Sequence, residues 1–275
     1  MSIEMNDWLL KTPIAHRGLH DDEIPENSMI AFESAIEAGY PIEVDVQLTK
    51  DKVPIVFHDD IMTRLTGLKR RVTRVKFEVI KKLRIGNTDT KIPTFREFLD
   101  LVDGRVPLLI EVKKQRGSKG IERIVMDMMK DYKGKYVIQS FNPIAIRKIR
   151  KINPNIYCGL LSSKLTEMKL FFLSKAAVKN ARLFFIAKPD FVSFEINSFP
   201  NDRVARFREE LKLPIIGWTI KTKDDIKCAI KYCDGIIFEG IENLITYLQS
   251  TGEDTLLGQV ALPLHTDRFV WEKPS

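Results

Sequence analysis

The stretch PIEVDVQLTKDKVPIVFHDD, residues 41–60, decides how the rest of the chain is interpreted. It contains two strand-like runs, IEVDVQL and VPIVFH, separated by a few polar residues. The connection is too short for the crossover helix that parallel neighbours need, so the two runs are predicted to form an antiparallel hairpin. Acids alternate with valines in the first run, which predicts one polar and one apolar face.

The chain contains seven other short runs rich in β-branched and apolar residues: PIAHR, PLLIEVK, KYVIQSF, NIYCGLL, DFVSFEI, PIIGWTI and DGIIFE. Segments with apolar residues at helical spacing, such as NSMIAFESAIEAG and PTFREFLDLVDG, lie between them. Alternation of strands and helices is typical of a parallel sheet, and eight such units are typical of a (β/α)8 barrel. Nine runs are one too many, but treating VPIVFH as a hairpin partner leaves eight. We therefore expect an α/β chain with a (β/α)8 barrel, or TIM barrel, over residues 1–258.

Two segments fit no strand–helix unit. Residues 60–92, directly after the strand that ends at His58, are interpreted as a small insertion, and residues 259–275 as a tail packed on the barrel. The chain has a formal net charge of +7, and residues 60–92 hold ten Lys and Arg against three Asp and Glu, which accounts for the whole excess. This basic segment is either a solvated face or a patch that attracts an anionic substrate or an anionic lipid surface.

Composition limits the class of protein. With 275 residues and 44% hydrophobic residues, the chain can bury a full core. No run of 18 apolar residues is present, so no membrane-spanning helix is expected. The N-terminus lacks the apolar core of a secretory signal. The three cysteines, without C-x-x-C spacing, are interpreted as reduced thiols of a cytoplasmic protein. We expect no nucleic-acid partner.

The hairpin predicts where His58 lies. A two-residue turn at Lys50–Asp51 would place Glu43 opposite His58, and a turn at Asp51–Lys52 would place Asp45 opposite it. Either register puts His58 on the face that Glu43 and Asp45 share.

Acidic residues on two predicted strands indicate a metal site. Glu43 and Asp45 lie on one strand face, and Glu111 and Lys113 repeat the pattern in LLIEVKK. Carboxylates that converge at the rim of a barrel suit a hard divalent cation, Mg²⁺ or Ca²⁺. The plain alternative is that these acids only form ion pairs with Lys113 and Arg17, but buried charges are costly and three inward acids make that alternative weak.

The first predicted strand ends in AHRG, so His16 and Arg17 should lie at the same rim. Two histidines beside a metal and two cationic side chains suit cleavage of a phosphodiester, which needs a proton acceptor, a proton donor and positive charge on the phosphoryl oxygens. His20, in an acidic loop, is interpreted as solvated. In PENS, residues 25–28, Asn27 or Ser28 is the expected N-cap of the next helix, which leaves Glu26 unexplained.

Taken together, AHRG with PENS, EVDVQLTKD with PIVFHD, IPTFREFLDLV, LLIEVK and GWTI resemble, in order, the pattern of glycerophosphodiester phosphodiesterases. The resemblance covers about residues 12 to 250. It implies a phospholipase-C-like TIM barrel with an insertion at residues 60–92. It further implies a divalent metal on the three acids and His16 and His58 as acid and base. The remaining residues that it implies, for phosphate and substrate, are Arg17, Lys113, Glu26, Asn27 and Trp218.

The activity implied by this resemblance is metal-dependent hydrolysis of glycerophosphodiesters, in lipid metabolism, to sn-glycerol 3-phosphate and an alcohol. Alternatives are a lysophospholipase D-type enzyme that acts at a membrane surface, and a catalytically silent barrel that binds anions. The chain departs from the family pattern in three places. Lys221 stands where an Asn often follows the residues WT, and Lys52 stands where Gly is common. The third departure is IIFEG in the last strand. The basic, Phe-rich residues 164–188 are interpreted as an outer barrel helix rather than a lipid-binding one.

Overall fold

The structure is a computed structural model that describes residues 8–113, 117–163, 186–201, 204 and 208–240. Eight parallel strands form a closed barrel, in the order β1-β9-β8-β7-β6-β5-β4-β2, which closes where β1 pairs with β2. This confirms the predicted TIM barrel, and a ninth strand, β3, pairs antiparallel with β2. The strands are β1 (Ile14–His16), β2 (Ile42–Leu48), β3 (Pro54–Val56), β4 (Leu108–Val112), β5 (Tyr136–Ser140), β6 (Cys158–Ser162), β7 (Phe191–Glu195), β8 (Ile215–Ile220) and β9 (Gly235–Phe238).

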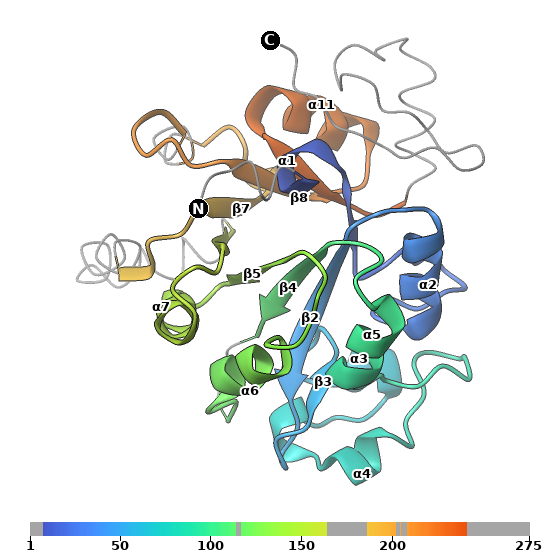
Figure 1. Cartoon of the computed structure of the whole chain (residues 1–275). Helices are drawn as coiled ribbons and strands as arrows, with labels where there is room; N and C mark the ends of the chain where they lie inside the picture. The colour runs from blue at the N-terminus through green and yellow to red at the C-terminus, as the bar shows by residue number, and fades with distance from the viewer. Residues whose placement is uncertain (1–7, 114–116, 164–185, 202–203, 205–207, 241–275) are drawn as a thin grey trace.

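Helices surround the strands, and Figure 1 shows α2, α5, α6 and α7 outside the early strands. Ser28 is the N-cap of α2 and accepts a hydrogen bond from the backbone N–H of Ala31 at 3.2 Å. This settles the capping role that the sequence left open between Asn27 and Ser28. The described helices are α1 (Trp8–Lys11), α2 (Met29–Glu37), α3 (Thr63–Thr66), α4 (Phe77–Ile80), α5 (Phe95–Val102), α6 (Ile121–Met128), α7 (Pro143–Ile152) and α11 (Lys223–Tyr232), with short 3-10 turns η2 (Val72–Arg74) and η3 (Ile196–Ser198).

The hairpin is confirmed, but both predicted registers are wrong. Val46 pairs with Val56, so by extension of this ladder the position opposite His58 is Val44 rather than Glu43 or Asp45. The reason is a turn of three residues instead of two, residues 50–52, closed by the backbone bond from Thr49 N–H to the Val53 carbonyl. Lys52 has a φ of 68°, which is the left-handed residue that such turns require.

The barrel interior has an apolar floor. Apolar side chains that point inward near the start of their strands pack with Trp8 and Leu9 of α1 into one buried cluster. These side chains are Ile14, Leu109, Val137, Phe191, Ile216 and Ile237. A Cβ on Gly159 of β6 would lie 2.2 Å from the Phe191 ring, so this glycine makes room for the floor. Because side chains alternate along a strand, the next inward positions, toward the C-terminal ends, can be polar.

The basic segment, residues 60–92, has apolar packing of its own. Met62, Val72, Ile80 and Ile85 are buried together with Ile55 and Phe57 around β3. In Figure 1, α4 lies at the periphery of the molecule beyond β3. Among the described residues, no helix has the length and apolar character needed to cross a membrane.

All three cysteines are described and free, as predicted. The segment interpreted as an outer helix, residues 164–188, lies outside the described residues up to residue 185, and the tail at residues 259–275 lies entirely outside them.

Candidate active site

The chain turns sharply after β1, and this turn brings Arg17 back over the strand ends. Arg17 has a φ of 57° and Gly18 a φ of 83°. A Cβ at position 18 would lie 2.7 Å from the backbone of Ala31, so only glycine fits this approach. Arg17 then reaches two acids: Nη1 lies 2.7 Å from Glu26 Oε1, and Nε lies 3.1 Å from Asp45 Oδ2.

Three buried carboxylates gather on β2 and β4. Asp45 and Glu111 are opposite each other in the parallel register, and Glu43 precedes Asp45 on the same inward face. One oxygen atom from each of the three lies within 4.8 Å of the others. Lys113 Nζ lies 3.1 Å from Asp45 Oδ1 and 3.0 Å from Glu111 Oε1. The cluster therefore has partners for some of its charge.

The pKa values of these groups show that the compensation is incomplete. Burial, and repulsion from Asp45 and Glu111, raise the pKa of Glu43 well above its ordinary value. Burial alone would also raise the pKa of Asp45, but Lys113 and Arg17 outweigh it and hold this pKa far below its usual range. Three acids thus face two cationic side chains. Closely spaced carboxylate oxygens with one uncompensated charge fit a hard divalent cation.

The chain leaves the sheet after β3, and His58 lies in the segment that follows. Gln47 Nε2 donates to the backbone carbonyls of Phe57, His58 and Asp59, at 2.7, 2.8 and 3.0 Å. These bonds fix the path of the segment, so that the charge of His58 helps to lower the pKa of Asp45. The ring itself is held at Nδ1, which lies 2.8 Å from Asp59 Oδ1.

Arg64 of α3 links the basic segment to the site. Its guanidinium donates to both oxygens of Glu26, at 2.7 and 2.8 Å, and to both oxygens of Asp59, at 2.8 and 2.9 Å. Glu26 also binds Arg17, and Asp59 also binds His58. Arg64 therefore connects Asp59, which binds His58, with Glu26, which binds Arg17.

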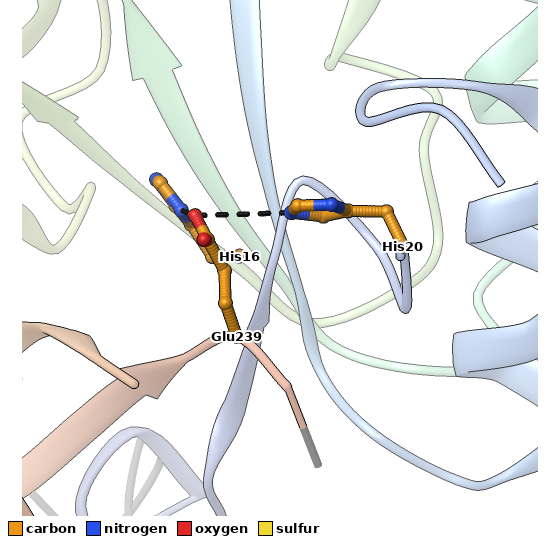
Figure 2. Close-up of side chains that lie close together, drawn as sticks. All are labelled: His16, His20 and Glu239. Atoms are coloured by element: carbon orange, nitrogen blue, oxygen red, sulfur yellow. Dashed lines mark hydrogen bonds and ion pairs between the residues drawn. The ribbon is translucent and has the colours of Figure 1, made fainter. Parts of the chain in front are cut away.

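His16 is held from the other side of the barrel closure, by Glu239 just beyond β9. Its Nδ1 hydrogen-bonds to Glu239 Oε1, and Lys221 Nζ forms an ion pair with Glu239 Oε2. Figure 2 shows the imidazole of His20 directed toward this pair, with Nε2 3.7 Å from Glu239 Oε1. Burial and the charge of Arg17 lower the pKa of His16 to about 4, although Glu239 acts to raise it.

Trp218, near the end of β8, lies against Phe141 in an edge-to-face contact with ring centroids 5.8 Å apart. Its buried Nε1 has no hydrogen-bond partner among the residues that the structure describes. The partly exposed ring of Trp218 can pack against the apolar face of a ligand.

The structure brings most of the predicted site residues into one contact network: His16, Arg17, Glu26, Asn27, Glu43, Asp45, Glu111 and Lys113, with His58 and Trp218 at the ends of neighbouring elements. Asn27 donates from Nδ2 to Asp45 Oδ2 at 3.0 Å. The prediction that His20 is solvated is wrong, because only 15% of its side chain is exposed. The roles assigned to these residues stay predictions.

Three residues of the network were not identified from the sequence. Asp59 follows His58 directly, Arg64 was counted only as part of the basic segment, and Glu239 appeared only as a departure from the family pattern in IIFEG. Adjacency to a histidine was an available signal for Asp59. Arg64 contacts Asp59 five positions away, but its contact with Glu26 spans 38 positions and that of Glu239 with His16 spans 223, and nothing local in the sequence reveals these two.

Comparison with known proteins gives a consistent picture. The model of the glycerophosphoryl diester phosphodiesterase family matches residues 16–242. A glycerophosphodiester phosphodiesterase of Caldanaerobacter subterraneus subsp. tengcongensis is 32% identical over 253 residues, which cover 87% of this chain and 98% of the relative. One of Bacillus subtilis is 28% identical, covering 65% and 68% of the two chains.

Solved structures show the same fold. A phosphodiesterase of Oleispira antarctica, in complex with the product sn-glycerol-3-phosphate, superposes with a TM-score of 0.71 at 20% identity, covering 90% of this chain and 99% of that one. A glycerophosphodiester phosphodiesterase of Thermotoga maritima gives a TM-score of 0.65 at 25% identity, covering 86% and 97%.

Proposed function

This chain belongs to the glycerophosphoryl diester phosphodiesterase family and is a phosphoric diester hydrolase, and we propose that it hydrolyses glycerophosphodiesters to sn-glycerol 3-phosphate and an alcohol. The observation that carries the proposal is the convergence of two histidines and two cationic side chains on three buried carboxylates. The Oleispira antarctica structure, which contains sn-glycerol-3-phosphate, supports this choice of product.

We propose that Glu43, Asp45 and Glu111 hold one divalent cation, Mg²⁺ or Ca²⁺. The fit rests on the donor set described above: carboxylate oxygens only, closely spaced, with one charge uncompensated. When bound, the cation supplies positive charge to the phosphoryl oxygens of the substrate.

His16 and His58 are proposed to transfer the two protons of the reaction. Cleavage of the P–O bond needs one group that takes a proton from the attacking oxygen and another that gives a proton to the leaving alcohol. The attacking oxygen belongs to water or to a neighbouring hydroxyl of the substrate. Each imidazole is fixed at Nδ1 by a carboxylate, Glu239 or Asp59, so each presents Nε2 for these transfers.

Arg17 and Lys113 are proposed to bind the phosphate. Both are cationic and largely buried, and both already contact the carboxylates on which the cation would lie. Glu26 and Asn27 support this arrangement, since Glu26 holds Arg17 and Asn27 holds Asp45. Trp218 is proposed to line the side of the site that receives the glycerol.

The remaining assignments are also proposals. We propose that residues 60–92 are an insertion into a barrel domain of residues 1–258, because their apolar side chains pack around β3 and Arg64 is their link to Glu26. A cytoplasmic location and peripheral contact with anionic lipid follow only from the sequence pattern.

The test is a product assay on a panel of glycerophosphodiesters and lysophospholipids, with and without a chelator. We expect sn-glycerol 3-phosphate from the glycerophosphodiesters, and loss of the reaction when the cation is removed. If the lysophospholipids released a phosphate-containing product and the glycerophosphodiesters did not, the proposed substrate class would be wrong. Binding without turnover, in protein supplied with Mg²⁺ or Ca²⁺, would contradict catalysis itself.

A further inference from the structure

The carboxylate of Glu239 lies where the last strand of the barrel meets the first. Strand β9 pairs in parallel with β1, with Ile14 opposite Ile237 and Ala15 opposite Phe238. His16 and Glu239 continue the inward-facing positions of these two strands, and therefore meet above the apolar floor. The closure of the barrel thus brings together two residues that are 223 positions apart.

We propose that Glu239 is the positioning residue of His16, and that Lys221 in turn holds Glu239. The inference rests on the proposed function of His16 in proton transfer. Glu239 Oε1 accepts a hydrogen bond from His16 Nδ1–H, which fixes the imidazole as the tautomer with a free lone pair on Nε2. That Nε2 faces the carboxylate cluster, 3.8 Å from Glu43 Oε2.

The support behind Glu239 is also built into the fold. Lys221 Nζ pairs with the second oxygen, Oε2, so both oxygens of the carboxylate have a partner. The backbone N–H of Lys221 donates to Asp225 Oδ2 at 3.1 Å, next to the capping box of α11. The backbone N–H of Glu239 donates to the carbonyl of Ile220 at 3.0 Å. Strand β8 and helix α11 therefore set the position of the group that orients His16.

The same side chains could instead be ligands of a metal ion. His16, His20 and Glu239 each offer an atom within 4.8 Å of the others. The contacts argue against this, because Oε1 is engaged by His16 and Oε2 by the ammonium group of Lys221. A dication between them would face the positive charge of Lys221 at close range. We therefore assign the cluster to orientation of His16, and treat metal binding as an outcome of the test.

The first experiment measures the tautomer directly. The chain has only four histidines, so nitrogen NMR of protein labelled at histidine is simple, and His16→Gln identifies the signals of residue 16. We expect wild-type His16 to carry its proton on Nδ1. In Glu239→Ala the signals should report a mixture of tautomers or a mobile ring. A His16 signal that is the same in both proteins overturns the inference.

The second experiment separates orientation from binding. Glu239→Ala should lower kcat on the order of 10²-fold with little change in KM, because both carboxylate oxygens of Glu239 are engaged by His16 and Lys221. Glu239→Asp should recover part of the rate. Glu33→Ala, which removes an exposed carboxylate of α2 that pairs with Arg105, is the control and should keep normal kcat. Glu239→Gln, of the same size, replaces Glu239→Ala if circular dichroism shows that the alanine variant does not fold.

Failure of the inference can be told apart from failure of the proposed function. If His16→Ala keeps its activity, the role of His16 itself is wrong. If His16→Ala is inactive while Glu239→Ala has normal kcat, only the inference is overturned. Calorimetric titration with Zn²⁺ decides the metal alternative: binding to the wild type that is lost in His20→Ala would overturn the positioning role, and no such binding supports it.

Discussion

Asp45 and Glu43 lie two residues apart on one strand face, yet their surroundings give them opposite properties. Asp45 contacts Lys113, Arg17 and Asn27, so its charged form is favoured. Glu43 contacts a backbone N–H, that of Arg17, at 3.3 Å, and its pKa is raised by burial. Without a cation the surroundings of Glu43 favour its protonated form, and a bound cation would stabilise its ionised form.

We expect a divalent cation to stabilise the folded protein. Mg²⁺ or Ca²⁺ at about 100 times its Kd should add about 2.7 kcal/mol to the free energy of unfolding. The Tm, measured by differential scanning fluorimetry, should rise by roughly 2–4 °C for each kcal/mol. Glu111→Gln should largely lose this response. Equal Tm values in chelator and in saturating Mg²⁺ and Ca²⁺ would contradict the proposed metal site.

His16→Ala and His58→Ala should each lower kcat on the order of 10²–10⁴-fold, because each removes one proton transfer. Steady-state kinetics on a soluble glycerophosphodiester gives the rate, and circular dichroism checks the fold. Arg123→Ala, on the exposed face of α6, is the control and should behave as wild type. Near-normal turnover by His58→Ala would remove His58 from the mechanism.

At the scale of elements, the β2–β3 hairpin shows what the sequence could and could not reveal. Its existence followed from the short connection between two strand-like runs. Its register depended on whether the turn has two or three residues, and this was decided by the left-handed conformation of Lys52. His58 nevertheless lies near enough for its charge to lower the pKa of Asp45, and Gln47 binds the backbone that follows β3. Side-chain bonds within the hairpin thus bring His58 near the site, although the predicted register was wrong.

The turn itself can be tested with two substitutions at one position. Lys52→Gly should keep or raise the stability, by up to about 1 kcal/mol, because glycine adopts a positive φ without strain but orders at some entropic cost. Lys52→Val should destabilise by about 1–2 kcal/mol. Both lose the bond from Lys52 Nζ to the Gly117 carbonyl, so each controls for the other. Urea unfolding gives the comparison, and equal midpoints for the two variants would refute the role of the turn.

Helix α3 carries the link between the basic segment and the site, so a change there should act at a distance. Arg64→Ala should lower kcat/KM by roughly 10–100-fold, because Glu26 and Asp59 lose the group that fixes them and small displacements of catalytic groups are costly. Arg64→Lys should recover little of the lost kcat/KM, since an ammonium group cannot bridge two carboxylates as a guanidinium does.

Arg84→Ala, in the same segment, is the matched control for Arg64→Ala, because Arg84 approaches Asp89 at 3.8 Å and no site residue. It should leave kcat/KM unchanged. If the two alanine variants have the same kcat/KM, Arg64 is only a surface ion-pairing residue.

For the molecule as a whole, the strand count and barrel closure were predictable because strand–helix alternation is written locally along the chain. The polar layer above the floor was predictable too, from the paired acids in IEVDVQL and LLIEVKK. The partners that orient the histidines were not, because strand order in the closed barrel decides which distant residues become neighbours. Glu239 is the clearest case, since only the β1–β9 pairing brings it to His16.

The distribution of charge over the molecule predicts a dependence on salt. The basic segment carries the whole formal excess of +7, and a phosphodiester is anionic. We expect kcat/KM for soluble diesters to fall as ionic strength rises, because screening shortens the range of attraction. Changing Lys69, Arg70, Arg71 and Arg74 to Gln should flatten this dependence, and the same variant should lose any binding to acidic vesicles. If neither property changes, the patch is a solvated surface.

The contact between His16 and Glu239 joins an early part of the chain to a late one, and this has a consequence for biosynthesis. A growing polypeptide on the ribosome exposes both histidines and all three carboxylates while Glu239 is still to be translated. Ile237, part of the barrel floor, is also missing at that stage. If Glu239 orients His16 as inferred, a nascent or prematurely terminated chain possesses the reactive groups without their working arrangement. Catalysis then begins only when translation has passed the last strand, so hydrolysis reports that the ring of strands is complete.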